Sequence, residues 1–562
     1  MASTAAATAS AWAPLRVRAF RILWTAQLFS MLGTWMQTVG AQWLLVDQPN
    51  AATLVGLVQT AAMVPTLLLA MPAGAVADIV DRRRLLIVVQ LFQVLVGAVL
   101  TVLAAAGQLP PLVLLTATFL LGCGTTVTIP AYQAVVQELV GREQMRSAVA
   151  LNGVAMNLAR AVGPAIAGLL VAQIGVAAVF ALNAVTYLVL AAALARLPRS
   201  SGEEDLLRER FRGAMVAGAR YVRHSLVLRR LLLRTVLFVV PGAALWALLP
   251  LVASQLLGLD ALGYGLLLAA LGIGAIIGAA VLPAVGARLS PNGLTLSAGL
   301  VFGAATLICA LVHNLTADLV ALVPAGIAWL CMLATMNGTL QMFLPGWVRA
   351  RGLSIYQMVF FGGQAIASLL WGVLAQWLGL ETALVAAGAL LAVGAPTVLR
   401  WPLRDISGLD RNPAVYWPEP QVEVDPELED GPVLVTLRYT VAPQNARNFL
   451  EAMGPVRRMK RRTGATSYAL HQDAADPTQF VEVTQYPSWA EHLRQHAGRL
   501  TGSDQALEAA AREYTTGTPQ VQHLVPPRPP QVDGPTGSSE RSSSTDRVGP
   551  HADQVPGDGR PE

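Results

Sequence analysis

The feature that most constrains the fold is a series of long apolar stretches that fills most of the first 400 residues. A helix needs about 20 mostly apolar residues to cross the hydrocarbon core of a bilayer. About twelve stretches meet this requirement, at residues 20–46, 53–77, 85–106, 110–137, 147–174, 176–196, 230–257, 262–285, 292–312, 316–340, 352–378 and 380–399. Only 13% of all residues are charged, whereas soluble domains contain roughly a quarter. The sequence therefore predicts an all-α polytopic membrane protein with 12 transmembrane helices.

The charged residues indicate how these helices are oriented. Basic residues stand in alternate loops and at both ends of the apolar region, at Arg16, Arg18, Arg21, Arg82–Arg84, Arg142, Arg146, Arg288, Arg349, Arg351, Arg400, Arg404 and between Arg196 and Arg230. The other loops carry Asp47, Asp260, Asp318 and Glu381 and no basic residue. Because basic loops stay on the cytoplasmic side, both termini are expected in the cytoplasm. Arginines confined to helix ends do not form the exposed basic face of a nucleic-acid binder, so the expected partner is the lipid bilayer.

The apolar region contains an internal repeat. The segment "AIAGLLVAQIG" at 165–175 is similar to "AIASLLWGVLAQWLG" at 365–379. The sequence therefore predicts two related six-helix bundles, at 20–196 and 230–400, separated by a basic loop at 197–229. Transporters built from two repeats bind substrate between them, near the membrane midplane, and work by alternating access. Apolar residues recur at helical spacing within the loop, which predicts an amphipathic helix either on the membrane surface or packed against the bundle.

The charged loop between the second and third predicted helices resembles the loop signature of the major facilitator superfamily. The matching residues, in register, are Gly74, Asp78, Arg82 and Arg83. The loop departs from the signature at Ile79, where arginine is common, and at Asp81, where glycine is usual. The resemblance implies that the aspartate and arginines dock on the start of the eleventh helix and lock one conformation. A carboxylate near a helix N-terminus is stabilised by unpaired N–H groups and the helix dipole, which is consistent with such a latch.

A second motif and its surroundings indicate a branch of this superfamily. Gly163, Pro164 and Gly168 resemble the antiporter motif of exporters, although small residues also simply let helices pack closely. Residues 129–168 are similar to the transmembrane secretion effector branch, which includes enterobactin-exporter-like proteins, and this resemblance extends over 20–525. It implies a multi-pass protein of the bacterial cytoplasmic membrane that exports siderophores, antibiotics or other small molecules by proton-coupled antiport. It implies no enzymatic activity and no cofactor.

Arg160 is the foremost candidate for contacting substrate, because it lies near the middle of the predicted helix at 147–174. An arginine at the bilayer centre costs at least about 2.5–3.5 kcal/mol. It is therefore expected either to bind an anionic group of the substrate or to pair with polar neighbours, and Asn157, one turn earlier, could share either role. Weaker candidates, on helices that line the cavity in this superfamily, are Gln27, Gln37, Tyr132, Trp246, Asn337 and Gln341. Amide pairs that hold helices together are the alternative for these residues.

The sequence contains no obvious coupling residue. The acidic residues of the apolar region stand in the predicted loops or at the ends of the predicted helices. No buried carboxylate is therefore expected within a spanning helix. A coupling proton would then have to be carried by Asp47, by Asp78 or by the substrate. The chain also lacks an ATP-binding P-loop motif, so it is not a primary pump by itself. Uptake in place of export is an alternative direction of transport.

The C-terminal part differs in composition from the bundles. A linker at 401–431, rich in proline and acidic residues, leads to 432–526, where strand and helix patterns alternate in the order β-α-β-β-α-β. This order predicts an α+β, ferredoxin-like domain, and it resembles the antibiotic-biosynthesis-monooxygenase-like domains. Such a domain is expected in the cytoplasm as a sensor or as the contact of a homodimer; alternatively, it carries the activity of a membrane-tethered enzyme or sensor. The short N-terminus at 1–19 is expected in the cytoplasm, and 527–562 is expected to be disordered.

Three histidines of this domain are candidate metal ligands. His492 and His496 are four residues apart on a predicted helix, so they share one face and could bind a metal with His471. Glu491 and His492 are in the wrong order for a zincin motif, and no third ligand has a reliable spacing. The expectation is therefore histidines at the surface or at a dimer interface, and no metal.

Overall fold

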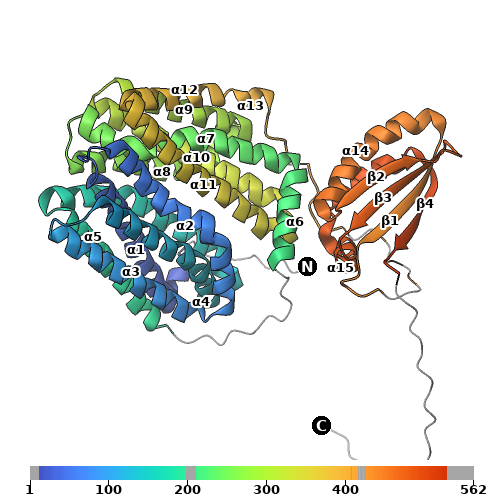
Figure 1. The fold of residues 1–562 in the computed structure, drawn as a ribbon, viewed down its shortest axis with the longest axis horizontal. Coiled ribbons are helices and arrows are strands. Elements are labelled where there is room, and N and C mark those ends of the chain that lie inside the picture. Colours follow the sequence, from blue (N-terminus) through green and yellow to red (C-terminus); the bar gives the residue numbers. More distant parts are fainter. Residues whose placement is uncertain are drawn as a thin grey trace, which may run out of the picture.

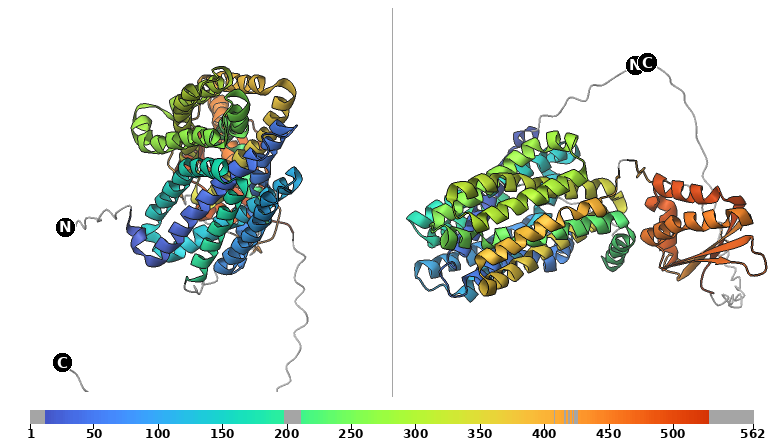
Figure 2. Two further views of the ribbon diagram at one scale, coloured as in Figure 1. Left: turned by 90° about the vertical axis from the view of Figure 1, so that its left-hand side faces the viewer. Right: turned by 90° about the horizontal axis from the view of Figure 1, so that it is seen from above.

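The structure is a computed structural model that describes residues 12–197 and 211–527, apart from a few positions between 407 and 425. Two groups of long helices lie beside each other, and a smaller domain with a β-sheet lies at one end of them (Figures 1 and 2). That end of the bundle is called the domain end below. Residues 1–11, 198–210 and 528–562 lie outside the described ranges. The predictions made for these segments, including the disordered tail at 527–562, therefore stay predictions.

The first helical half follows a short 3-10 turn at Ala13–Arg16. Its helices are α1 (Arg18–Trp43), α2 (Ala51–Ile79), α3 (Arg82–Ala105), α4 (Pro111–Gln173) and α5 (Val176–Ala195). The 63 residues of α4 contain two of the predicted helices, which meet at Gly141. This residue has a φ of 67°, a conformation that glycine adopts without steric cost. The chain therefore passes from one membrane helix to the next without an intervening loop.

The second helical half has the same general layout. Its helices are α7 (Leu226–Leu251), the π-helical turn Val252–Leu256, α8 (Ala261–Arg288), α9 (Pro291–Leu311), α10 (Leu315–Phe343), α11 (Gly346–Leu378), α12 (Leu380–Gly394) and the short α13 (Thr397–Arg400). Several begin at a polar residue whose side chain accepts a hydrogen bond from the first turn, as Asp260 does from Gly263 and Asn314 from Ala317. Such caps satisfy backbone N–H groups that a helix leaves unpaired.

The structure confirms a multi-pass membrane protein, although not the number of spans. In the described ranges, eleven helices are long and apolar enough to cross a bilayer. The 26-residue helix α1 is not among them, although it packs against α4 and α5. Polar residues such as Ser30, Gln37 and Gln42 are buried along α1 and dilute its apolar character. Twelve spans therefore remain a prediction.

The two halves meet through small residues. A Cβ atom at Gly56 of α2 would lie 2.5 Å from the carbonyl oxygen of Ser368 in α11. A Cβ atom at Gly168 of α4 would lie 2.5 Å from the carbonyl oxygen of Ala261 in α8. Small residues let helices approach this closely in membranes. Both contacts lie toward the end of the bundle opposite the domain end, because α8 begins there and α11 ends there.

The paired contacts are consistent with the predicted repeat. Exchanging the two halves replaces α2 by α8, and the second part of α4 by α11, so the α2–α11 contact becomes the α4–α8 contact. The repeated segments also end alike, since Gly175 after α4 has a φ of 103° and Gly379 after α11 has a φ of 92°. Each of these glycines immediately precedes the next helix. The halves are thus related both in their contacts and in the turn that closes the repeated helix.

Helix α6 (Phe211–His224) connects the bundle to the C-terminal domain (Figure 1). Tyr221 is buried, and its ring lies 5.7 Å from that of Trp347 in α11 and 6.3 Å from that of Phe343 in α10. On its other side α6 contacts α14 of the domain. Of the two alternatives for the amphipathic helix in the 197–229 loop, the structure therefore supports packing against the bundle.

The C-terminal domain contains one antiparallel sheet with strand order β2-β3-β1-β4. Its elements are β1 (Val433–Val441), a 3-10 turn (Pro443–Asn445), α14 (Ala446–Thr463), β2 (Ser467–Gln472), β3 (Gln479–Tyr486), α15 (Trp489–Arg494), a π-helical turn (Gln495–Arg499), α16 (Gly502–Arg512) and β4 (Thr515–Leu524). Alternate residues of β1, including Val433 and Val435, are buried against α14 with Phe449. The expectation of surface histidines is wrong for His492, which is fully buried.

Candidate functional site

A cavity of about 400 Å³ lies between the two halves. Its walls come from α1, α2, α4 and α5 of the first half and from α7, α10 and α11 of the second. The second half contributes mainly aromatic rings: Trp246 and Phe360 flank Trp329, with ring centroids 5.4 and 6.3 Å from it. A second cavity of about 220 Å³ shares Trp35 and Met156 with the first and extends into the first half. Cavities of this combined size accommodate drug-sized molecules.

Arg160 is the one charged residue among the described residues that line the larger cavity. Its guanidinium carbon lies 5.5 Å from the ring centroid of Trp35, within the range of a cation–π interaction. Its Nε atom is buried and has no hydrogen-bond partner within the described residues. The side chain therefore presents a positive charge to the cavity without an acidic residue beside it.

The other predicted contacts divide between the cavities and the surrounding helices. Gln37 and Trp246 line the larger cavity, whereas Gln27 and Tyr132 line the smaller one. The side-chain oxygen of Gln37 accepts a hydrogen bond of 3.4 Å from Asn183. The Nε1 atom of Trp246 has no partner within the described residues, so it can donate to a bound molecule.

Three predicted residues lie outside both cavity linings. Asn157 donates to the carbonyl oxygen of Gly153 at 3.0 Å, within its own helix. Asn337 accepts a hydrogen bond of 3.2 Å from Gln341, and both side chains are exposed. Residue type and predicted helix alone do not determine which face of a helix lines a cavity.

Polar residues that sequence reasoning missed complete the lining. Gln59 of α2 and Gln364 of α11 line the larger cavity from opposite halves, and both are buried. Gln90 and Gln93 of α3 line the smaller cavity, and Gln93 donates to the carbonyl oxygen of Leu121 at 3.1 Å. The spacing of three residues between Gln90 and Gln93 places them on one helix face, a signal that could have been used.

The loop between α2 and α3 makes contacts within the first half. Arg82 forms an ion pair with Glu138 of α4, and Arg83 Nε donates to the carbonyl oxygen of Leu194 in α5 at 2.8 Å. Gly74 and Asp78 lie in the last turns of α2. In this conformation the two arginines therefore contact α4 and α5 of the first half, and not α11 as expected.

The departure of this loop from its signature has a structural explanation. Asp81 stands where the superfamily usually has glycine, and its side chain accepts a hydrogen bond of 2.9 Å from the backbone N–H of Arg84. Asp81 has a φ of −52°, so the turn does not need the positive φ that glycine allows. The residue acts as the N-terminal cap of α3, a role for which aspartate is well suited.

The antiporter-like motif lies at close helix contacts. A Cβ atom at Gly163 would lie 2.9 Å from the Cβ atom of Trp35 in α1. A Cβ atom at Gly265 of α8 would lie 2.6 Å from the carbonyl oxygen of Pro164. Together with Gly168, the motif therefore lets α4 approach α1 and α8, and so joins the cavity wall to the contact between the halves.

A buried acid contradicts the expectation that no carboxylate lies within a spanning helix. Asp318 is in the first turn of α10 and is fully buried. Neither carboxylate oxygen makes a regular hydrogen bond within the described residues, although the carboxylate interacts with the Cys309 thiol of α9 and with His313. His313 in turn pairs with Glu381 of α12 at 3.2 Å, and both of these side chains are exposed. Asp318, His313 and Glu381 thus form a series of interacting groups that leads from a buried position in the second half to the surface at the end of the bundle opposite the domain end.

Comparison with known proteins identifies the family. A family model described as "Transmembrane secretion effector" matches residues 9–529, which include both bundles and the C-terminal domain. The chain belongs to this family. Its members are transporters, so this transmembrane secretion effector is a multi-pass membrane exporter and not an enzyme.

Named relatives of this secretion effector are transporters. It is 26% identical to the staphyloferrin A transporter of Staphylococcus aureus over 60% of its own length and 85% of the relative. It is 25% identical to the multidrug efflux pump Tap of Mycolicibacterium fortuitum, covering 68% and 95% of the two chains. Macrolide efflux protein A of Streptococcus pyogenes is 24% identical, over 42% of this chain and 59% of the relative.

A solved structure supports the fold of the bundles. The bacterial homolog of the human lysosomal transporter Spinster superimposes with a TM-score of 0.55 at 15% identity, and the match covers 68% of this chain and 96% of that one. The match covers less of this chain than the family model does.

Proposed function

We propose that this secretion effector exports small amphipathic or anionic molecules, such as siderophores or other secondary metabolites, by alternating access coupled to proton entry. The observation that carries the proposal is Arg160 at an aromatic-lined cavity between the two halves, with an Nε atom that has no hydrogen-bond partner within the described residues. Aromatic rings provide apolar contact area, and guanidinium groups bind carboxylates and related anions with directed hydrogen bonds. A substrate with an aromatic or apolar body and an anionic group satisfies both. The names of the staphyloferrin A and macrolide relatives are consistent with molecules of this kind.

The direction of opening follows from the distribution of charge and contacts. We infer that the domain end faces the bacterial cytoplasm, because the arginine-rich loops lie there and basic loops remain inside. The close contacts at Gly56 and Gly168 lie toward the other end, which supports an assignment of this conformation as closed to the outside. When the halves rock, Arg82 and Arg83 would exchange their partners in α4 and α5 for α11, and this exchange would form the latch implied by the loop signature.

Asp318 is the proposed site of proton coupling. Burying a charged carboxylate is costly unless hydrogen bonds compensate it, and Asp318 lacks regular ones within the described residues. His313 interacts with this carboxylate and pairs with Glu381, and both of these side chains are exposed. A proton entering there would reach Asp318 in one conformation and leave it in the other. Because α10 also carries Trp329 of the cavity wall, movement of this helix would connect the proton to the substrate.

We propose that the C-terminal domain, whose sheet has the strand order β2-β3-β1-β4, is ferredoxin-like and joins two chains into a homodimer. Val521 and Leu524 of β4 are about half exposed in the single chain, and a partner chain would cover them. Light scattering of the full chain in detergent should give the mass of two chains after correction for detergent. A monomer at micromolar protein concentration would contradict the dimer.

Export is tested by untargeted mass spectrometry of culture medium and cell extracts. Strains would overexpress wild type or Arg160→Ala, matched for the amount of protein in the membrane, with an empty vector as baseline. A compound that accumulates outside and falls inside only with wild type would establish export and identify a substrate. Accumulation inside the cells would instead indicate uptake and contradict the proposed direction.

A further inference from the structure

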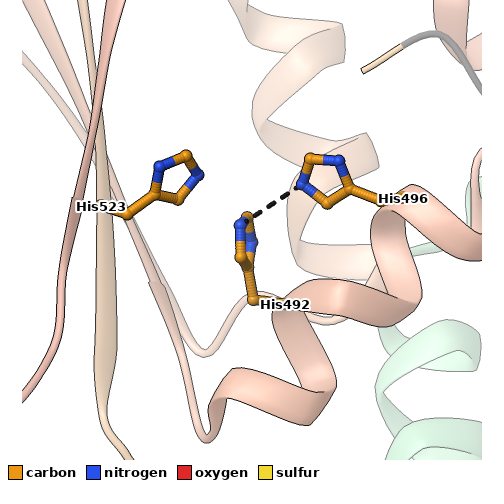
Figure 3. A group of neighbouring side chains, drawn as sticks. All are labelled: His492, His496 and His523. Atoms are coloured by element: carbon orange, nitrogen blue, oxygen red, sulfur yellow. Dashed lines mark hydrogen bonds between the residues drawn. The ribbon is translucent and has the colours of Figure 1, made fainter. Parts of the chain in front are cut away.

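Three histidines converge inside the C-terminal domain (Figure 3). His492 projects from α15, His496 from the π-helical turn that follows it, and His523 from β4. One ring nitrogen of each lies within 4.8 Å of the others. His471, the third ligand considered from the sequence, lies on β2, at the other edge of the sheet from β4, and is not part of this group. The fold thus supplies a third histidine that sequence spacing does not identify.

The spacing of the ring nitrogens suits a metal ion. The Nε2 atoms of His492 and His496 are 3.3 Å apart. Zinc binds imidazole nitrogens at about 2.0–2.1 Å in a tetrahedral arrangement, which places two such nitrogens about 3.3 Å from each other. A ring nitrogen of His523 lies within 4.8 Å of those of the other two histidines. It would complete the set by moving to about 3.3 Å from each of them, the separation expected for nitrogens bound to one zinc ion. His496 and His523 are only partly buried, so their rings have room for this adjustment.

Aromatic side chains surround the buried His492. Tyr486 and Trp489 lie with their ring centroids 5.2 Å from that of His492. Metal binding requires neutral imidazole, and an apolar shell of this kind limits competition from water.

Lys460, a buried cation whose charge acts on His492, is paired with carboxylates. Lys460 Nζ lies 3.0 Å from a carboxylate oxygen of Glu508 and 3.8 Å from one of Glu482. These three side chains are all buried. Arg512 also pairs with Glu508, at 3.3 Å, so two cations balance the two glutamates and this group carries no net formal charge.

We propose that His492, His496 and His523 bind one divalent transition-metal ion, for which zinc is the best fit. Imidazole ligands suit zinc, copper and nickel rather than magnesium or calcium. Three protein ligands leave the fourth tetrahedral position for water or an exchangeable ligand. The buried Nδ1 atom of His492 has no hydrogen-bond partner within the described residues, so we expect weaker binding than in sites whose histidines have such support. This inference does not depend on the proposed transport function.

The test is metal binding by the full chain in detergent, purified with an affinity tag that contains no histidine. After treatment with a chelator and its removal, Zn²⁺ is titrated by calorimetry, and Co²⁺ serves as a visible probe of tetrahedral coordination. We expect one Zn²⁺ per chain and a Co²⁺ spectrum of the tetrahedral type. His523→Gln and His496→Gln should each weaken Zn²⁺ binding by at least about tenfold, while the matched control His471→Gln keeps it.

Partly buried positions are chosen because replacing the fully buried His492 could unfold the domain. Thermal unfolding of each metal-free variant checks that His523→Gln and His496→Gln remain folded. The two substitutions lie on different elements, so if one variant unfolds, the other still tests the site. Failure of the wild type to bind one ion at micromolar Zn²⁺ would overturn the proposal. Equal affinities of the wild type and both variants would also overturn it, because the ion would then bind elsewhere.

Discussion

Replacing Arg160 by alanine should abolish export while leaving the amount of protein in the membrane unchanged. The guanidinium group lies at the cavity, and its Nε atom has no partner within the described residues. Within the described residues, its loss therefore removes no ion pair. A hydrogen bond to a charged group contributes about 1.5–3 kcal/mol, which corresponds to roughly a ten- to hundredfold loss of affinity for an anionic substrate. Efflux of the substrate identified by mass spectrometry, measured per unit of membrane protein, is the readout.

Asn157→Ala is the matched control for this prediction. Asn157 lies one turn before Arg160 in the same helix, but it bonds to Gly153 and does not line either cavity. We expect its replacement to change efflux less than about twofold, since exposed substitutions away from a site have small effects. Preserved efflux in Arg160→Ala would mean that the arginine only packs against Trp35. A fall in membrane levels would instead assign Arg160 a role in the fold.

Replacing Asp318 by asparagine should uncouple transport from the proton gradient. The substitution keeps the size of the buried side chain but removes the group that binds and releases a proton. In membrane vesicles, efflux driven by a pH gradient should fall by at least about tenfold, which is the effect of about 1.4 kcal/mol. Exchange of labelled for unlabelled substrate, which needs no net proton movement, should persist. Both are measured on the same vesicles, so a variant that fails to fold is recognised by the loss of exchange.

Asp47→Asn is the control for Asp318, because Asp47 is an exposed acid near the same end of the bundle. It should retain gradient-driven efflux. Gradient-driven efflux at the wild-type rate in Asp318→Asn would show that the buried acid is structural. The coupling proton would then have to be carried elsewhere, for example by Asp78 or by the substrate.

The parts of the fold that follow from local composition could be predicted from the sequence. Apolar length and arginine-rich loops identify the helices because insertion into a bilayer depends on these local properties. The continuous α4 was predicted as two helices, and the left-handed Gly141 shows why a loop is not needed between them. The strand and helix order of the C-terminal domain was also readable, since burial alternates along β1 and β3.

Properties that depend on packing between distant segments could not be predicted. Asp318 was expected in a loop at the start of the predicted helix 316–340, but it lies in the first turn of α10 and is buried beside Cys309 of α9. The cavity joins Gln59 and Gln364 from different halves, and no sequence spacing connects them. His523 joins the histidine group only because β4 lies beside β1 in the sheet. For the cavity and the histidine group the decisive neighbour is remote in the sequence, whereas the burial of Asp318 depends on how α9 packs against α10.

The attachment of the C-terminal domain has a mechanical consequence. Within the described part of the chain, the domain contacts α6 and α11, for example through Arg499 on Trp347, and the linker contacts α10 through Arg411 on Phe343. The domain is therefore fastened to the second half and does not brace the two halves together. When one half rotates against the other, a point on the domain is displaced in proportion to its distance from the rotation axis. If the halves rotate during transport, the sheet would therefore move farther than the helices close to the rotation axis.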